Sequence, residues 1–139
     1  MVNRTQALVL GFLLVALASV LAIRIAAPEV YDLALGLPAD ERRWESVLLG
    51  ALAVFILLLG VGVLRRWRWT FWLITVAFLA GVLRAPAAIL QLTGILAADA
   101  QTWYLVFQGL LGMGQFAIGL AMVAAYRRAG VWGASAARR

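Results

Sequence analysis

The sequence predicts an all-α integral membrane protein in which four transmembrane helices form an antiparallel bundle. Three observations support this prediction. First, 65% of the 139 residues are hydrophobic and the mean hydropathy is +0.99, well above the roughly 45–50% apolar content of soluble domains. Second, four apolar runs each approach the roughly 20 residues that span a bilayer core. Third, the basic residues lie at the ends of these runs. Together these observations predict one membrane domain over residues 1–139.

The first span is expected over residues 6–25, ending near Arg24. Its basic start followed by apolar residues also fits a secretory signal. The candidate cleavage point after Ala27 is followed by Pro28, however, which makes a poor cleavage site. We therefore interpret the run as a transmembrane helix.

The segment from Ala26 to Glu45, which contains the first loop, carries all of the six acidic residues except Asp99. Pro28 at a helix start and Gly36 at its end predict a short interfacial helix in this external loop. A lid facing a substrate is the alternative. The second span is expected over residues 44–64, and the arginine cluster after it makes a tight connection to the third.

The third span is expected over residues 69–90, with a kink at Pro86. Proline removes the hydrogen bond to the Val82 carbonyl and collides with that turn. The residues after Pro86 either continue a strongly tilted helix or lie in the interface. The fourth span is expected over residues 102–126, followed by a flexible basic tail over residues 129–139.

The arginines predict the orientation, because short cytoplasmic loops and tails carry an excess of basic residues. With four spans, the two termini and the second connection share one side. The other side holds Arg24, Arg42 and Arg43 together with all six acidic residues. Both termini are therefore expected in the cytoplasm, with the protein in the plasma (inner) membrane. The arginines of the terminal side are Arg4, Arg65, Arg66, Arg68, Arg127, Arg128, Arg138 and Arg139.

Arg84 is the one charged residue well inside a span. It lies about 22 Å past Trp69 along the helix axis, which leaves it roughly 7 Å inside the outer boundary. Gln108 on the fourth span reaches a similar depth. We therefore predict a polar pocket that opens outward. Its expected residues are Arg84, Gln108, Tyr104, Ser19, Gln91 and Gln115, with Asp99, Asp32, Glu29 or Glu45 as counter-charges.

Three interpretations of Arg84 stay open: snorkelling to the headgroups, an ion pair that fixes a loop, and a ligand or ion site. The glutamines fit hydrogen bonds between helices equally well, and most tryptophans fit an interfacial belt. Small residues recur at helical spacing and predict close helix packing. They are Ala77 and Gly81 on the third span and Gly112, Gly119, Ala117 and Ala121 on the fourth.

The sequence offers few side chains suited to catalysis, because it has no histidine and no cysteine. This excludes a Ser-His or Cys-His pair and any imidazole or thiolate metal site. We expect no cofactor and no metal. A lipid-modifying enzyme using Asp99 or Glu45 is the remaining catalytic alternative.

The arrangement is similar to that of many small four-span bacterial membrane proteins. We expect a non-catalytic accessory, scaffold or interaction subunit that packs against other helices. The alternative is an oligomeric transporter, channel or lipid- or anion-binding module built around Arg84. The expected partners are the bilayer, anionic lipid at the cytoplasmic face, and either further copies of the chain or a larger membrane complex. A pI near 11.3 indicates membrane-surface anchoring here, and not nucleic-acid binding.

Overall fold

The computed structural model describes residues 2–26, 42–96 and 101–133, and this part of the chain is helical. Four of its helices are long and apolar enough to cross a membrane, over Arg4–Ala26, Ser46–Leu64, Arg68–Leu92 and Thr102–Ala129. The predicted number of spans is confirmed. The elements are α1 (Arg4–Ala26), α3 (Arg42–Leu64), α4 (Arg68–Ala80), the 3-10 helix η2 (Gly81–Leu83), α5 (Arg84–Leu92) and α6 (Thr102–Ala129).

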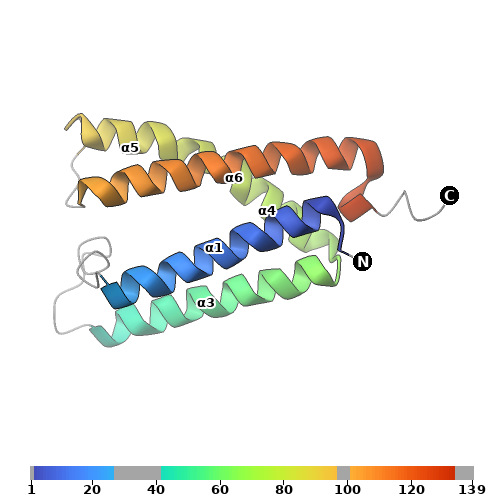
Figure 1. The fold of residues 1–139 in the computed structure, drawn as a ribbon, viewed down its shortest axis with the longest axis horizontal. Coiled ribbons are helices and arrows are strands. Elements are labelled where there is room, and N and C mark those ends of the chain that lie inside the picture. Colours follow the sequence, from blue (N-terminus) through green and yellow to red (C-terminus); the bar gives the residue numbers. More distant parts are fainter. Residues whose placement is uncertain (1, 27–41, 97–100, 134–139) are drawn as a thin grey trace.

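The four spans lie side by side as two pairs (Figure 1). One pair is α1 with α3, and the other is α6 with the third span, which is built from α4, η2 and α5. The start of α1, the turn between α3 and α4 and the end of α6 meet at one end of the molecule. We call the half of the molecule near this end the terminal half, and the other half the distal half.

The third span changes from α-helix to 3-10 helix at Gly81–Leu83 and resumes as α5 at Arg84. Pro86 therefore lies in the first turn of α5. A residue in a first turn needs no intrahelical N–H bond, so proline is tolerated there. The helix continues to Leu92 after Pro86.

The main hydrophobic core lies in the terminal half, and in the distal half the buried hydrophobic side chains among the described residues are Ala88 of α5 and Leu105 of α6. Val9 and Leu13 of α1 are buried, but no hydrophobic residue of α1 beyond Leu13 is. Likewise α3 has no buried hydrophobic side chain before Leu59 among those described. The buried core cluster is Val9, Leu13, Leu59, Val63, Phe71, Ile74, Phe78, Met122 and Trp132.

The end of the chain differs from the expectation of a flexible tail from residue 129. After Gly130 the backbone forms a 3-10 turn over residues 131–133, and Trp132 is only 1% exposed. Its ring meets that of Phe71 edge to face, with centroids 5.0 Å apart. The rest of the predicted tail, residues 134–139, and the predicted interfacial helix of the first loop lie outside the described residues.

Candidate functional site

The structure brings Arg84, Gln108 and Tyr104 together in the distal half. Arg84 is the first residue of α5, and its Nη1 donates to Oε1 of Gln108 at 3.4 Å. Gln108 Nε2 in turn donates to the Tyr104 hydroxyl at 2.6 Å, one turn away on α6. The Arg84 bond is long, so it contributes little, and the Arg84 side chain is exposed. Among the described residues, the other donors of the guanidinium have no recorded acceptor.

Glycines explain how these side chains come within reach of each other. A Cβ atom on Gly112 of α6 would lie 2.6 Å from both the Arg84 Cβ and the Gly81 carbonyl oxygen. A Cβ atom on Gly119 would lie 3.1 Å from the backbone nitrogen of Leu79. Only glycine lets the backbones of α6 and the third span approach this closely.

The other predicted pocket residues are Ser19, Gln115 and Gln91. Ser19 on α1 donates its hydroxyl to the Val15 carbonyl of its own helix, at 2.8 Å. Gln115 packs beside Gly81, whose Cβ would lie 2.8 Å from the Gln115 Cβ. Gln91 is half-buried near the end of α5. No recorded hydrogen bond within the described residues joins these three to Arg84.

The predicted counter-charges are not described. Glu29, Asp32 and Asp99 lie outside the described residues, and Glu45 lies in α3 with an undescribed side chain. Among the predicted packing residues, Ala77, Ala117 and Ala121 are exposed. They therefore do not mediate the close contacts that Gly81, Gly112 and Gly119 make within this chain.

A second polar network ties the terminal half together. Asn3 and Gln6 cap the start of α1 reciprocally: the Gln6 amide N–H donates to Asn3 Oδ1 at 2.8 Å, and the Asn3 N–H donates to Gln6 Oε1 at 3.1 Å. Buried Gln6 also donates from Nε2 to the Val63 carbonyl at 2.6 Å. Asn3 Nδ2 donates to the Trp132 carbonyl at 2.8 Å.

The same network reaches the turn between α3 and α4, because Trp132 Nε1 donates to the Trp67 carbonyl at 3.0 Å. Sequence reasoning missed it. The available signal was the spacing of Asn3 and Gln6, which is that of a capping box.

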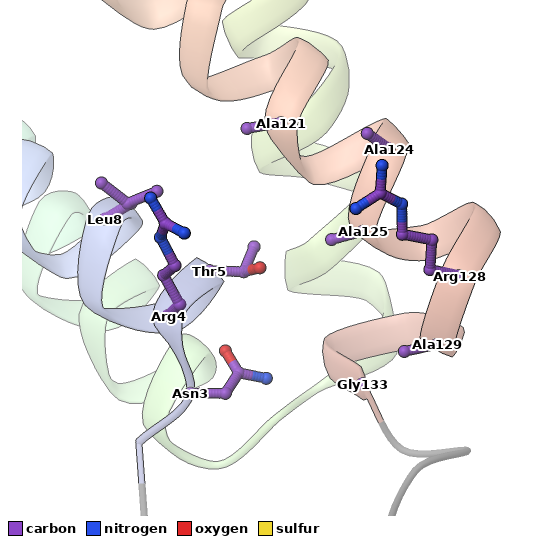
Figure 2. Close-up of a pocket in the computed structure, with 10 residues that line it drawn as sticks. All are labelled: Asn3, Arg4, Thr5, Leu8, Ala121, Ala124, Ala125, Arg128, Ala129 and Gly133. Atoms are coloured by element: carbon purple, nitrogen blue, oxygen red, sulfur yellow. The ribbon is translucent and has the colours of Figure 1, made fainter.

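Figure 2 shows a pocket between the start of α1 and the end of α6, which we call the terminal pocket. Its volume is about 570 Å³. Arg4 and Arg128 stand on its opposite walls, and Ala121 and Ala125 point from α6 toward α1. The lining residues are Asn3, Arg4, Thr5, Leu8, Ala121, Ala124, Ala125, Arg128, Ala129 and Gly133.

A second depression, the α1–α3 groove, has a volume of about 320 Å³ and an almost wholly apolar lining. Its residues are Leu10, Leu13, Leu14, Leu17, Ile56, Leu57, Gly60, Val61 and Leu64.

Comparisons of this chain with protein-family models, curated proteins and solved structures found no match.

Proposed function

We propose that this chain is a non-catalytic interaction subunit of the plasma (inner) membrane, which packs its helices against other membrane helices. In this proposal the four spans run antiparallel, both termini lie in the cytoplasm, and the third span bends at the η2–Pro86 segment. The first loop carries an interfacial helix outside the membrane. The distribution of arginines supports the orientation.

The observation that carries the proposal is a contrast between two sets of glycines. The space beside one set, Gly81, Gly112 and Gly119, is occupied by other atoms of the chain. The other set is open, because a Cβ added there would meet nothing within 4 Å; it comprises Gly11, Gly50 and Gly60. A glycine inside a helix costs about 1 kcal/mol relative to alanine. Small residues on a membrane helix allow a second helix to approach closely. The open glycines make no such contact within the described part of this chain, so a helix of another chain is the partner that they fit.

One of the open glycines, Gly60, lies in the α1–α3 groove. Gly60 lines the groove together with Leu57 and Val61, whose side chains are exposed. Helices in lipid associate through close packing and not through the hydrophobic effect. A groove with a glycine in its wall therefore favours a partner helix, either from a second copy or from another subunit.

Cysteine cross-linking tests the proposal directly, because the chain has no cysteine of its own. Leu57→Cys places a thiol in the groove, and Val76→Cys places one on an exposed position of α4 outside the groove. In native membranes, oxidation should cross-link Leu57→Cys to a copy of itself, or a short bifunctional reagent should join it to a partner. Val76→Cys should stay monomeric. Equal yields from the two variants, or adducts from neither, would contradict the proposal.

Gly60→Leu provides the complementary test. The position is open within the chain, so the variant should unfold at about the same temperature as the wild type. It should nevertheless reduce cross-linking through Leu57→Cys, because leucine blocks the close approach of a second helix. Unchanged cross-linking would exclude the groove as the contact surface.

A second function, an anion- or lipid-binding module that includes transporters and channels, is favoured by the exposed Arg84. Its recorded partner is a neutral amide, so its positive charge is not compensated within the described residues. Charges placed inside a membrane are costly and are usually functional. In this case Arg84→Gln should lower binding of an anionic solute without lowering thermal stability. A loss of stability with unchanged binding would assign Arg84 a structural role instead.

A further inference from the structure

The terminal pocket combines two positive charges with a hydrophobic wall. Arg4 and Arg128 line opposite sides of the pocket, on α1 and α6 (Figure 2). Both side chains are exposed, and neither has a recorded ion pair or hydrogen bond within the described part of the chain. Two uncompensated guanidinium groups on one cavity repel each other, and an anion between them removes that repulsion.

The start of α1 adds to this preference for an anion. Asn3 caps the Gln6 N–H and accepts from Ala7 N–H through its carbonyl. The N–H groups of Arg4 and Thr5 have no recorded acceptor among the described residues. Free N–H groups and the positive end of the dipole make the start of a long helix favourable for phosphate. The Thr5 hydroxyl lines the same space.

The remaining lining is hydrophobic and continues along the spans. Leu8 of α1 and Ala121 and Ala125 of α6 lie one to two turns farther into their helices than the two arginines. Both helices are long and apolar enough to cross a membrane. The cavity is therefore cationic at the membrane edge and apolar toward the bilayer. A phospholipid has the matching arrangement, with a charged headgroup at the membrane edge and acyl chains inside.

From this geometry we infer that the terminal pocket is a binding site for one anionic phospholipid of the leaflet that holds the start of α1 and the end of α6. Arg4 and Arg128 clamp the phosphate, with the Thr5 hydroxyl and the first N–H groups of α1 as further donors. An acyl chain lies against Leu8, Ala121 and Ala125. Ala121 is exposed, and its small side chain leaves room for the acyl chain.

The site is separate from both the α1–α3 groove and Arg84, so it does not depend on the function proposed above. Its occupant is coupled to the core through Asn3, which lines the pocket and bonds the Trp132 carbonyl. A lipid that binds only the folded state raises its stability in proportion to the logarithm of lipid concentration over Kd. Bound lipid should therefore raise the unfolding temperature.

The test uses the full chain purified in a neutral detergent and titrated with phosphatidylglycerol or phosphatidylcholine. Bound lipid is counted by native mass spectrometry, and the unfolding temperature is read in parallel. We expect one tightly bound phosphatidylglycerol, and Arg4→Gln or Arg128→Gln should each weaken it about tenfold or more, because each removes charged hydrogen bonds. Arg128→Lys keeps the charge and should recover part of the affinity.

Arg127→Gln is the matched control, because Arg127 carries the same charge one residue away on α6 and does not line the pocket. It should weaken binding by no more than the roughly fivefold expected of a general surface charge. Ala125→Phe tests the apolar wall and should weaken phosphatidylglycerol binding while the lipid-free unfolding temperature is kept.

Three results would overturn the inference. The first is equal affinity for the two lipids, and the second is an equal effect of Arg127→Gln and Arg128→Gln. The third is full displacement of the lipid by millimolar inorganic phosphate, which would make free phosphate the ligand and leave the apolar wall without a role.

Discussion

The terminal and distal halves of this bundle are held together in different ways. In the terminal half all four spans share one core, and polar side chains link the two chain ends to the turn between α3 and α4. In the distal half the tight contacts lie between α6 and the third span, at Gly81, Gly112 and Arg84. The distal parts of α1 and α3 contribute no buried hydrophobic side chain to them.

This difference illustrates how helices associate in lipid. Hydrophobic side chains gain nothing by leaving the acyl chains for another helix, so close packing and hydrogen bonds decide which faces join. The terminal half has both, and the pair formed by α5 and α6 has the glycines. In the distal parts of α1 and α3, by contrast, the described residues include no buried hydrophobic side chain and no glycine in close contact. These are the surfaces on which the proposed partner helices would pack.

Trp132→Ala should produce the largest loss of stability, because it removes the shared element of the terminal half. The side chain is 1% exposed, packs on Phe71 and donates to the Trp67 carbonyl. Truncating a buried tryptophan costs about 3–5 kcal/mol. Chemical unfolding in detergent micelles, followed by circular dichroism, measures the change.

Trp44→Ala is the control for this substitution. Trp44 lies near the distal start of α3 and is 61% exposed, so its truncation should change the free energy of unfolding by less than about 1 kcal/mol. If the two variants lost equal stability, the core would not be concentrated in the terminal half.

Gly112→Ala should have the next largest effect, and it acts on the distal half. The added Cβ would collide with the Arg84 Cβ and the Gly81 carbonyl, both at 2.6 Å. Pushing α6 away from η2 should cost about 1–3 kcal/mol, the range for overpacking. Gly114→Ala is the matched control on the same helix, because its Cβ would meet only Phe12 at an ordinary 3.8 Å. Because alanine forms helices better than glycine by about 1 kcal/mol, Gly114→Ala should be neutral or stabilising. Equal effects of the two alanines on stability would show that the close contact at Gly112 does not support the distal half.

The sequence predicts the spans well because spanning length and hydropathy are local properties. It also predicts that Arg84 and Gln108 lie at the same depth, since both depths follow from the rise per residue along straight helices. The glycine contacts at Gly81, Gly112 and Gly119 follow from helical spacing in the same way. Each of these inferences needs only one helix and its register.

Most of the missed features require two segments that are distant in the sequence, and the local exception is the capping pair of Asn3 and Gln6. Burial of Trp132 depends on a turn after Gly130, whose φ is 70°, and on the left-handed φ of Trp132 itself at 51°. A short tail of small residues carries no periodic signal for such a fold-back. The terminal pocket likewise requires α1 and α6 to be neighbours, which the order of the spans does not determine. Ala77 was placed on the packing face by periodicity alone, yet the structure leaves it exposed.

Gln108→Leu should have a smaller effect than Gly112→Ala, because it removes polar contacts from an exposed region. The variant loses the long bond from Arg84 and the 2.6 Å bond to Tyr104. Interhelical hydrogen bonds in membrane proteins average about 0.6 kcal/mol, so the expected loss is of that order. A loss above about 2 kcal/mol would show that the Arg84 contact is a main support of the distal half, since side-chain bonds of this kind rarely reach that value.

Thr70→Val should have the smallest effect, and its sign is informative. Thr70 and Thr75 are both buried in the terminal part of α4. The Thr75 hydroxyl donates to the Phe71 carbonyl at 2.7 Å, whereas the Thr70 hydroxyl has no partner in the described residues. Valine keeps the shape of threonine and removes the hydroxyl. Replacing an unpaired buried hydroxyl should leave stability unchanged or raise it by up to about 1 kcal/mol.

Thr75→Val is the control for this last substitution, because it removes a hydroxyl that is bonded. It should lower the free energy of unfolding by about 0.5–1.5 kcal/mol. Gly62 explains why Thr70 is enclosed, because a Cβ there would lie 2.8 Å from the Thr70 Cγ2. α3 and α4 therefore meet at this point with no space for an acceptor beside the hydroxyl. If Thr70→Val destabilised the protein more than Thr75→Val, the Thr70 hydroxyl would have to be bonded in the membrane. The terminal half would then hold a polar contact beyond those between Asn3, Gln6 and Trp132.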